Sequence, residues 1–236
     1  ELQNEILSYH QVEILPIVGP DPSVTSVQEI TDKVITAAPD WIIAIGGGSV
    51  LDTAKAAAVI AYNGGDVQGH VKGTLKIKRP GIPVVAIPTT SGSGSEVTPY
   101  ASITDTQETR KISLSYDYLF PRMALLDPSL LLSLPPTQTA ISGMDALSHS
   151  IEGYWSNRAT SVTDDHAVAA AKMLLSGLPK SYTNPEDLES RRCALKGSVL
   201  AGLAISNAQT TAVHAISYPM TVHFHVPHGL ACSLLL

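Results

Sequence analysis

The sequence is poor in cysteine. Its two cysteines, Cys193 and Cys232, are too few for the disulfide framework that stabilises small secreted domains. Both thiols are therefore expected to be reduced, as they would be in the cytoplasm. No signal-peptide pattern opens the printed sequence, which also favours a cytoplasmic protein.

Charge and long apolar runs are also scarce. Charged residues make up 15% of the chain and the formal net charge is -6, so there is no basic field of the kind that binds nucleic acid. No apolar run reaches the roughly 18 residues that a membrane-spanning helix needs. We therefore expect neither a nucleic acid nor a membrane as a partner. A chain of 236 residues can bury a substantial core in one or two domains.

The first part of the chain alternates apolar strand patterns with helical patterns. Strands are predicted over Val12–Val18 and Trp41–Ile45, and helices over Pro22–Ala37 (begun near Ser23) and Ser49–Tyr62. This alternation is typical of a parallel sheet with crossover helices. The second strand is an unbroken apolar run, which predicts a strand covered on both faces.

Strand signals stop near residue 126, and helical spacing dominates from Pro135 onward. A loop is predicted at Gly64–Gly73, followed by extended segments at Ile82–Pro88, Tyr100–Asp105, Lys111–Ser115 and Met123–Leu126. Helices are predicted over Thr137–Trp155, Ala159–Leu178 and Pro185–Ser206. We therefore predict an α/β domain with a parallel sheet over residues 1–134 and an all-helical domain over residues 135–236.

Two segments of the second part offer ligands for a divalent metal ion. Asp145 and His149 are four residues apart, so a helix would place both side chains on one face. Alone, such a couple more often forms a solvated pair. However, four of the eight histidines lie between His214 and His228, and residues 210–236 contain no Asp, Glu, Lys or Arg. These imidazoles are therefore expected to be buried or to face a cleft, where they need polar partners or a metal.

Two glycine-rich loops follow predicted strands. Gly46-Gly47-Gly48-Ser49 lets the backbone approach a ligand closely, and the helix after it offers unpaired N–H groups to an anion. Asp52 could cap that helix or accept a hydrogen bond from a ribose. The loop at residues 89–96 is rich in hydroxyl groups and glycine. A tight turn or a flexible connector could use the same residues, but two such loops at strand ends favour a nucleotide site.

Together these motifs resemble the iron-dependent, or group III, alcohol dehydrogenases. The resemblance covers the whole printed chain and rests on Gly46-Gly47-Gly48-Ser49 with Asp52, the run from Pro88 to Thr98, Asp127-Pro128 before Pro135, the run from Gly143 to Tyr154, and His214 with Pro227-His228-Gly229. It implies an α/β nucleotide-binding domain, an all-helical metal-binding domain and an active site in the cleft between them.

The resemblance also implies which residues form the site. The metal ligands would be Asp145, His149, His214 and His228. The cofactor contacts would be Gly47, Gly48, Ser49, Asp52, Thr89, Thr90, Thr98 and Lys111. The implied metal is Fe²⁺, although one carboxylate and three imidazoles bind Zn²⁺ at least as well, and the implied hydride carrier is NAD or NADP.

The activity implied by the resemblance is hydride transfer between NAD(P)(H) and a small alcohol or aldehyde, with the metal polarising the substrate oxygen. The family also implies a homo-oligomer, a dimer or larger. One departure concerns the position one turn after His214, where the family often has another histidine and this chain has Tyr218. Tyr218 and His223 are the candidate catalytic residues, with His225 as a further substitute, although a phenol of pKa about 10 carries protons poorly near neutrality.

Other interpretations remain open. The Ser-Tyr-Pro run after His214 is similar to that of family members that reduce phosphonoacetaldehyde, but the sequence has no obvious Arg or Lys pocket for a phosphonate. Glu152 is interpreted as a helix-packing group rather than a catalyst, and Glu96 as either an acceptor near the site or a cap.

Two alternative functions accompany the dehydrogenase. The first is a non-redox lyase resembling dehydroquinate synthase, against which the Asp/His set and the Thr-Thr-Ser-Gly loop argue. The second is a non-catalytic fragment, since the chain opens on Glu1 and closes on an apolar run, so that both ends are expected to be cut.

Overall fold

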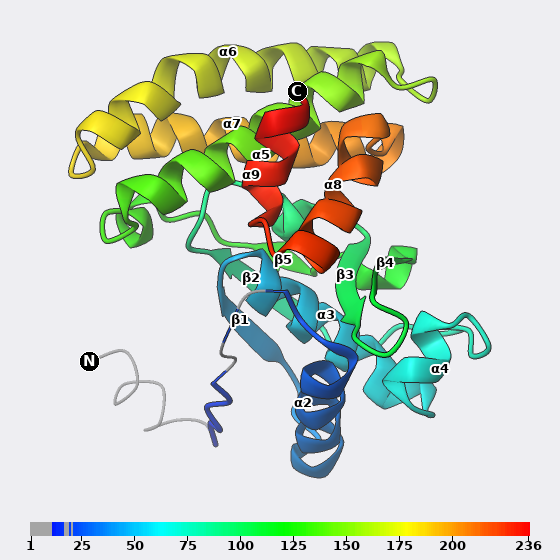
Figure 1. Ribbon diagram of the computed structural model, residues 1–236. Coiled ribbons are helices and arrows are strands. Elements are labelled where there is room, and N and C mark those ends of the chain that lie inside the picture. Colours follow the sequence, from blue (N-terminus) through cyan, green and yellow to red (C-terminus); the bar gives the residue numbers. More distant parts are fainter. Residues whose placement is uncertain (1–10, 17–18, 20) are drawn as a thin grey trace.

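The computed structural model describes residues 11–16, 19 and 21–236 and consists of an α/β part with a helical part above it (Figure 1). The α/β part contains helices α2 (Val24–Ala37), α3 (Gly48–Asn63) and α4 (Val67–Val71), strands β1 (Ile42–Gly46), β2 (Val84–Pro88), β3 (Tyr100–Asp105), β4 (Arg110–Ser115) and β5 (Met123–Ala124), and 3-10 turns η1 (Ser95–Val97), η2 (Asp117–Leu119) and η3 (Pro128–Leu131). The helical part contains α5 (Pro136–Trp155), α6 (Ser161–Thr183), α7 (Leu188–Ala208), α8 (Ala212–Phe224) and α9 (His228–Leu235). The predicted fold class is confirmed.

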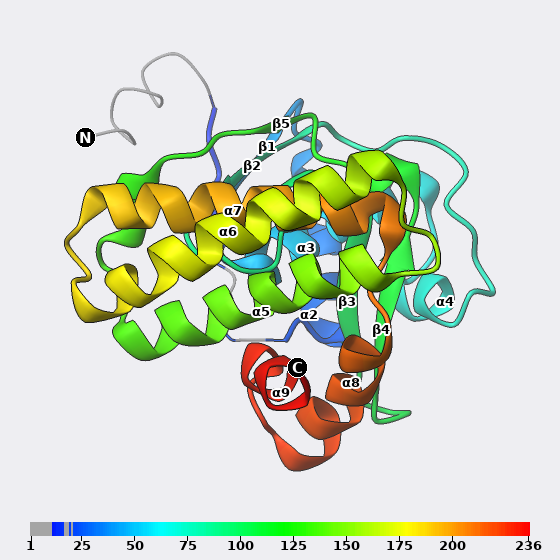
Figure 2. The ribbon, with the colours of Figure 1, turned by 90° about the horizontal axis from the view of Figure 1, so that it is seen from above.

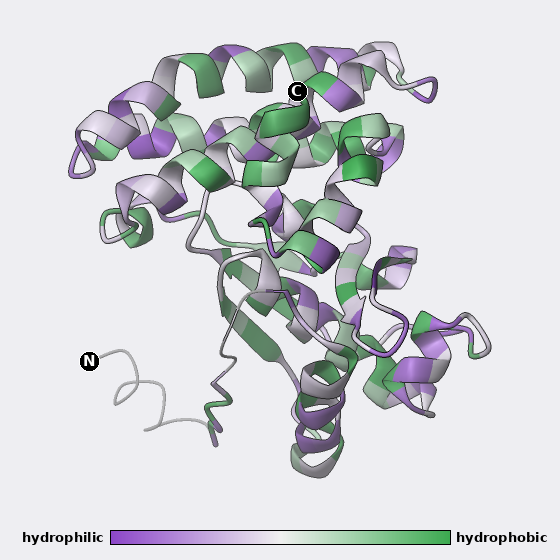
Figure 3. Ribbon diagram, viewed as in Figure 1, coloured by the Kyte–Doolittle hydropathy of each residue, from purple (hydrophilic) through white to green (hydrophobic). Residues whose placement is uncertain are grey.

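Strands β1, β2 and β5 form a parallel sheet in the order β1-β2-β5. Strands β1 and β2 pair over their whole length, from Ile42 opposite Val84 to Gly46 opposite Pro88, and both are hydrophobic in Figure 3. Because the carboxyl ends of parallel strands meet at one edge, the turn after Gly46 and the loop after Pro88 lie side by side. The backbone N–H of Thr89 donates to the Gly46 carbonyl across this junction.

Only one face of β1 is covered within the described part of the chain. Helices α2 and α3 pack on the face that carries Ala44 and Ala86. The alternate side chains, Ile43 and Ile45, point to the other face and are 56% and 49% exposed. The prediction that this strand is covered on both faces is therefore wrong for the described residues. An unbroken apolar run marks the strand, but burial of its second face requires another element to pack there.

The helices that flank the sheet begin where the sequence predicts. Ser23 and Ser26 form a capping box, each side chain accepting from the backbone N–H of the other, and α2 starts at Val24. Helix α3 starts at Gly48, directly after the glycine turn, with Gly47 as its N-cap. The turn and the helix N-terminus are therefore continuous.

Two further predictions for the α/β part are wrong. Residues 11–16 form no strand, and residues 17 and 18 of the predicted strand Val12–Val18 lie outside the described residues. An extended segment becomes a strand only when its backbone pairs with another strand. The predicted loop Gly64–Gly73 contains α4, which Asp66 caps by accepting from the Gly69 N–H. A five-residue helix is too short to show a helical period in the sequence.

Helices α5, α6 and α7 run beside one another and pack pairwise as a three-helix bundle, with α9 packed against α5 and α8 beside α9 (Figure 2). Small residues allow this close packing: a Cβ on Gly143 of α5 would lie 2.2 Å from a methyl carbon of Leu178 on α6. Helix α6 continues beyond its predicted end, through Pro179 to Thr183, because packing against α7 outweighs the backbone bond lost at proline. None of the helices in the described residues is both long and apolar enough to cross a membrane.

A buried arginine ties α7 to the start of α5. Arg191 is 1% exposed, and its guanidinium donates to Thr139 Oγ1 at 2.6 Å, to the Leu134 carbonyl at 2.9 Å and to the Pro185 carbonyl at 3.0 Å. These neutral acceptors satisfy donors that would otherwise be buried unpaired. The contact fixes the beginning of α5, the helix on which Asp145 and His149 lie.

Replacing Arg191 by methionine is expected to lower the free energy of unfolding by about 3 kcal/mol, because the Leu134 and Pro185 carbonyls would be left without this partner at about 1–3 kcal/mol each. Urea unfolding followed by circular dichroism measures the loss. The matched control is Arg192→Met, whose half-exposed side chain pairs with Glu189; we expect a change within about 0.5 kcal/mol there. Equal losses in the two variants would contradict the assignment.

Candidate functional site

A cavity of about 810 Å³ is lined by residues of both the α/β part and the helical part. Its volume falls in the range of about 300–1,000 Å³ that is usual for ligand clefts. The glycine turn contributes Gly47, Gly48 and Ser49, and the helical part contributes Asp145 and three histidines. One cleft therefore connects the two groups of residues that the sequence analysis singled out.

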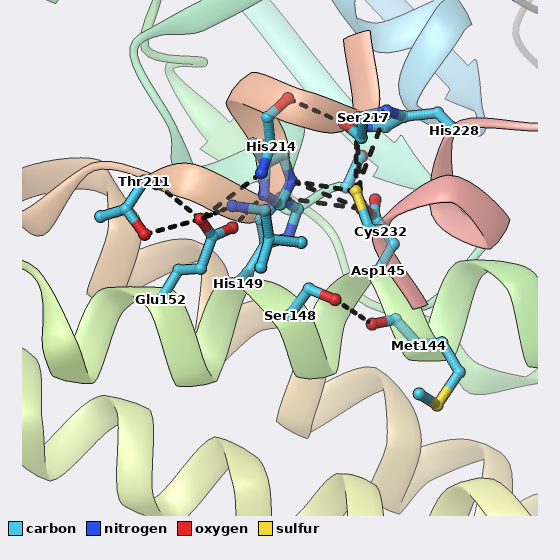
Figure 4. Close-up of polar contacts among 12 residues, drawn as sticks. Met144, Asp145, Ser148, His149, Glu152, Thr211, His214, Ser217, His228 and Cys232 are labelled. Atoms are coloured by element: carbon cyan, nitrogen blue, oxygen red, sulfur yellow. Dashed lines mark hydrogen bonds and ion pairs between the residues drawn. The ribbon is translucent and has the colours of Figure 1, made fainter. Parts of the chain in front are cut away.

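Asp145 and His149 lie one turn apart on α5, and both point toward histidines of α8 and α9 (Figure 4). The Nε2 atoms of His149, His214 and His228 lie 4.0, 3.6 and 3.8 Å from Asp145 Oδ1. His214 belongs to the first turn of α8, and His228 is the first residue of α9. The structure thus brings the predicted ligand set together, with the three histidines around one carboxylate oxygen of Asp145.

Cys232 joins this cluster, and the sequence analysis missed it. Ligand atoms of Asp145, His214, His228 and Cys232 all lie within 4.8 Å of one another. Cys232 is fully buried on α9, four residues after His228. The i,i+4 spacing that drew attention to Asp145 and His149 could have drawn attention to this pair as well.

The cluster fits a metal ion. Asp145 is buried, yet its Oδ1 atom has no hydrogen-bond donor among the residues that the structure describes, an arrangement that is costly unless a cation sits nearby. Burial raises the pKa of the Asp145 carboxyl, but the imidazoles of His149, His228 and His214 outweigh it and hold that pKa far below its usual range. Carboxylate, imidazole and thiolate donors together suit a first-row divalent metal.

Burial also keeps two of the imidazoles neutral. It lowers the pKa of His149 and lowers that of His228 to about 4. A histidine must be neutral to bind a metal, so near neutral pH both rings are in the form that can ligate.

Glu152 is more than the helix-packing group that the sequence suggested. It is fully buried on α5, and its Oε2 accepts from His214 Nδ1. Its Oε1 accepts from the backbone N–H groups of Thr211 at 2.7 Å and Val213 at 3.0 Å, and from the Thr211 hydroxyl. Glu152 therefore holds the proton on Nδ1, turns His214 Nε2 toward Asp145 and anchors the start of α8.

The glycine turn at the other end of the cavity is pressed against the loop after β2. A Cβ on Gly48 would lie 2.7 Å from Ser93 Cβ, and one on Gly47 would lie 3.3 Å from a methyl carbon of Thr90. Glycine is needed at Gly48 for this approach. Thr90 and Ser93 line the cavity, whereas Thr89 does not and is held by its backbone bond to Gly46.

Asp52 and Lys55 on α3 fix the second loop. Asp52 accepts from Ser95 Oγ at 2.6 Å and from the Ser102 N–H at 2.9 Å, while lining the cavity. It does not cap α3, since the N-cap is Gly47. Lys55 is 1% exposed and donates to the carbonyls of Ser95 at 2.9 Å and Thr98 at 3.1 Å. The sequence analysis did not single out Lys55, and a helical pattern alone does not mark a lysine as buried.

Glu96 lies beneath this loop rather than in the cavity. It is 4% exposed, and its Oε1 atom has no partner among the described residues. Burial raises the pKa of its carboxyl to about 7, and the same burial lowers the pKa of Lys55 to about 8. Within the described residues Glu96 neither caps η1 nor belongs to the metal cluster, so it is a buried titratable group of the loop.

The remaining predicted residues divide into those inside and outside the cavity. Thr98, Lys111, Tyr218 and His225 line it. Lys111 Nζ pairs with Asp21 Oδ1 at 2.6 Å, and burial raises the pKa of the Tyr218 hydroxyl. His223 is exposed and does not line the cavity. Nine residues along α8 rotate it by about 180° from His214, so its predicted catalytic role is not supported.

Two family models match the chain. The model described as "Iron-containing alcohol dehydrogenase" matches residues 4–128, and the model described as "Fe-containing alcohol dehydrogenase family, C-terminal" matches residues 139–236.

Curated relatives and solved structures agree with these models. Long-chain-alcohol dehydrogenase 1 of Geobacillus thermodenitrificans is 39% identical over 96% of this chain and 58% of that protein. NAD-dependent methanol dehydrogenase of Bacillus methanolicus is 40% identical over 94% of this chain and 58% of that protein. The crystal structure of sulfoacetaldehyde reductase from Bifidobacterium kashiwanohense in complex with NAD+ superposes with a TM-score of 0.86 at 37% identity, covering 91% of this chain and 57% of that one. The chain thus spans less than two thirds of the length of these relatives.

Replacing Glu152 by glutamine is expected to weaken metal binding at the cluster about 10–100-fold, because the partner that orients His214 loses its charge. Titration of Zn²⁺ against a chromophoric chelator measures the affinity. Glu189→Gln, on a side chain that is 78% exposed at the start of α7, is the control and should bind as the parent protein does. Unchanged affinity in a natively folded Glu152→Gln protein would refute this role.

The raised pKa of Glu96 predicts a pH dependence of stability. Between about pH 4.5 and 7 the native state holds a proton that the unfolded state has released, so the free energy of unfolding falls as pH rises through this window. Glu96→Gln removes this titration. We therefore compare the free energy of unfolding of the Glu96→Gln protein with that of the parent protein at the same pH. This difference should increase in favour of the variant by up to about 3 kcal/mol between acidic and slightly alkaline pH, because one unit of pKa shift corresponds to about 1.36 kcal/mol.

Urea unfolding at several pH values measures this difference. The control is Glu29→Gln on the exposed side of α2, which should show no such trend. A constant difference between the Glu96→Gln and parent proteins would contradict a raised pKa.

Proposed function

The chain belongs to the iron-containing alcohol dehydrogenase family, and on this basis we propose that it transfers a hydride between NAD(P)(H) and a small alcohol or aldehyde with the help of a divalent metal. The observation that carries the proposal is the single cavity with the glycine turn at one end and the Asp145 cluster at the other. Such a cleft can hold a dinucleotide and a small substrate in contact. Because the chain spans 58% of two relatives' length, the activity is proposed for the whole protein.

Four residues are proposed as metal ligands: Asp145, His149, His214 and His228. The Oδ1 of Asp145, which has no partner among the described residues, and the neutral imidazoles of His149 and His228 support this assignment. The family description favours iron, and we propose Fe²⁺ as the native metal. The same donors have a higher intrinsic affinity for Zn²⁺, so metal supply would decide occupancy.

The cofactor is proposed to bind at the glycine turn. The N–H groups at the start of α3 would face the diphosphate, and Gly47, Gly48 and Ser49 would let it approach the backbone. The other proposed contacts are Asp52, Thr89, Thr90, Thr98 and Lys111, with Thr89 acting through its backbone position. NAD is favoured over NADP, since one relative is NAD-dependent and another was crystallised with NAD+.

When bound, the nicotinamide would carry the hydride and the metal would act as a Lewis acid on the substrate oxygen. The described side chains prepare the site for this chemistry. Asp145 supplies negative charge, and Glu152 keeps the proton of His214 on Nδ1 so that Nε2 can ligate. Tyr218, whose ring centroid lies 5.6 Å from that of His228, is proposed to donate a hydrogen bond to the substrate.

The substrate is proposed to be an uncharged short alcohol or aldehyde. Among the described residues that line the cavity, Lys111 is the one lysine or arginine, and Asp21 already neutralises it. A phosphonate or sulfonate would therefore meet no free cation there. The phosphonoacetaldehyde resemblance and the sulfoacetaldehyde reductase relative make anionic aldehydes the alternative to test. The lyase alternative is not favoured, since both matching family models are those of alcohol dehydrogenases.

We also propose the domain limits, the oligomeric state and the cellular location of the protein. The chain is divided into a cofactor domain over residues 1–134 and a metal domain over residues 135–236, close to the limits of the two family models. The protein is proposed to form a homo-oligomer, a dimer or larger, and to act in the cytoplasm, where its two free cysteines would stay reduced.

Metal analysis of anaerobically purified protein, coupled to NADH and NADPH oxidation with acetaldehyde, propanal and phosphonoacetaldehyde, tests the function. We expect about one iron or zinc per chain, and faster turnover of the uncharged aldehydes with NADH. Asp145→Asn should lose the metal and at least about 99% of the activity together, because the remaining imidazoles lack the anionic ligand.

Asp40→Asn, at an exposed aspartate, is the control and should retain both metal and activity. A natively folded Asp145→Asn protein with a full complement of metal would overturn the ligand assignment. Bound metal without turnover of any aldehyde would overturn the proposed reaction.

A further inference from the structure

We propose that Cys232 is itself a ligand of the metal, so that the centre contains a sulfur donor in addition to Asp145 and histidines. The inference rests on the proposed metal site and adds a fifth residue to its four ligands. It also predicts a chemical property of the centre, a preference for softer divalent ions such as zinc and cobalt over harder ones such as manganese.

The distances place the sulfur within reach of the same ion as the imidazoles. Cys232 Sγ lies 3.8 Å from His214 Nε2 and 3.9 Å from His228 Nε2. An ion with metal–nitrogen bonds of about 2.1 Å and a metal–sulfur bond of about 2.3 Å keeps adjacent nitrogen and sulfur atoms about 3.1–3.8 Å apart in a five-coordinate shell, whose ligand–metal–ligand angles are about 90–120°. The observed separations lie at or just above the upper end of this range, and small side-chain rotations can reduce them.

The backbone holds the sulfur at this position. His228 and Cys232 lie one turn apart on α9, as Asp145 and His149 do on α5, and the two helices pack against each other. A Cβ on Gly229 would lie 2.2 Å from the Ile141 carbonyl oxygen, so glycine is required for this close approach. The first turn of α9 is thereby pressed onto α5, and Cys232 faces Asp145 (Figure 4).

A buried thiol can also be a simple packing group, but the surroundings of Cys232 differ from such a site. Its sulfur has imidazole nitrogens as hydrogen-bonding neighbours, and the adjacent Asp145 Oδ1 is buried without a donor from the described part of the chain. The other cysteine provides a contrast within the same chain. Cys193 donates to the Met173 carbonyl at 3.4 Å between α6 and α7, away from the cluster.

Sulfur ligation would change the charge of the centre. As the thiol S–H bond breaks and the sulfur–metal bond forms, the proton leaves to solvent and a thiolate remains. A divalent ion with Asp145 and three neutral imidazoles carries a net charge of +1, whereas the added thiolate makes the centre neutral. A neutral centre attracts anions less and binds soft ions more tightly.

Cobalt provides the first test, because a thiolate bound to Co²⁺ gives an intense near-ultraviolet charge-transfer band that oxygen and nitrogen ligands do not give. Co²⁺ is added to the metal-free full chain, its Cys232→Ser variant and its Cys193→Ser variant. We expect the band in the parent protein and in Cys193→Ser. Cys232→Ser should still bind one Co²⁺ but lose the band.

Metal selectivity provides the second test. Competition titrations with Zn²⁺ and Mn²⁺ measure the ratio of their dissociation constants in the same three proteins. Loss of a thiolate should reduce the preference for Zn²⁺ at least about tenfold in Cys232→Ser and leave it unchanged in Cys193→Ser. Loss of packing alone would weaken both metals by similar factors.

The outcomes separate this inference from the proposed function. A parent protein that binds Co²⁺ without the charge-transfer band overturns sulfur ligation while leaving the metal site intact, and this result needs no variant. An unchanged preference for Zn²⁺ in Cys232→Ser also overturns it. A parent protein that binds no Co²⁺ or Zn²⁺ at all refutes the metal site and, with it, the inference.

Discussion

The buried carboxylate of Glu152 is the contact on which the geometry of the metal cluster depends. It joins the last turn of α5 to the backbone of Thr211 and Val213 and to the ring of His214, so one side chain fixes both the start of α8 and the direction of a ligand. Without it, this contact would no longer hold the ligand on α8 in position relative to the two ligands on α5. Because the carboxylate is fully buried, its hydrogen bonds are not exchanged for water, and their geometry is held.

A buried lysine and its partly exposed aspartate partner hold the loop at the cofactor end. Lys55 and Asp52, on neighbouring turns of α3, hold the loop after β2 through Ser95, Thr98 and Ser102. A buried lysine is costly unless its ammonium is fully hydrogen-bonded, and here the carbonyls of a glycine-rich loop provide the acceptors. The loop therefore keeps a defined shape although its composition alone would allow many.

The cavity between these two anchored regions has walls of different character. The α/β wall offers the glycine turn and hydroxyl groups together with Asp21, Asp52 and Lys111, whereas the helical wall offers imidazoles and the carboxylate of Asp145. Segment 210–236 carries no acidic or basic residue other than histidine, so the wall near the cluster adds no competing charge. A low local dielectric strengthens the attraction between Asp145 and any cation held beside it.

The sequence by itself determined the fold class, the start of α2 and α3, and the placement of Asp145 and His149 on one helical face, because these depend on local period and capping. It also singled out His214 and His228, through the unusual concentration of histidine in an uncharged segment. Tertiary packing accounts for the exposure of Ile43 and Ile45 and for the direction of His223. It also accounts for the burial of Lys55 beneath the loop at the cofactor end and of Glu152 and Cys232 at the metal cluster. Those outcomes depend on which elements pack together and how closely, and close approaches such as that at Gly229 have no counterpart in local sequence pattern.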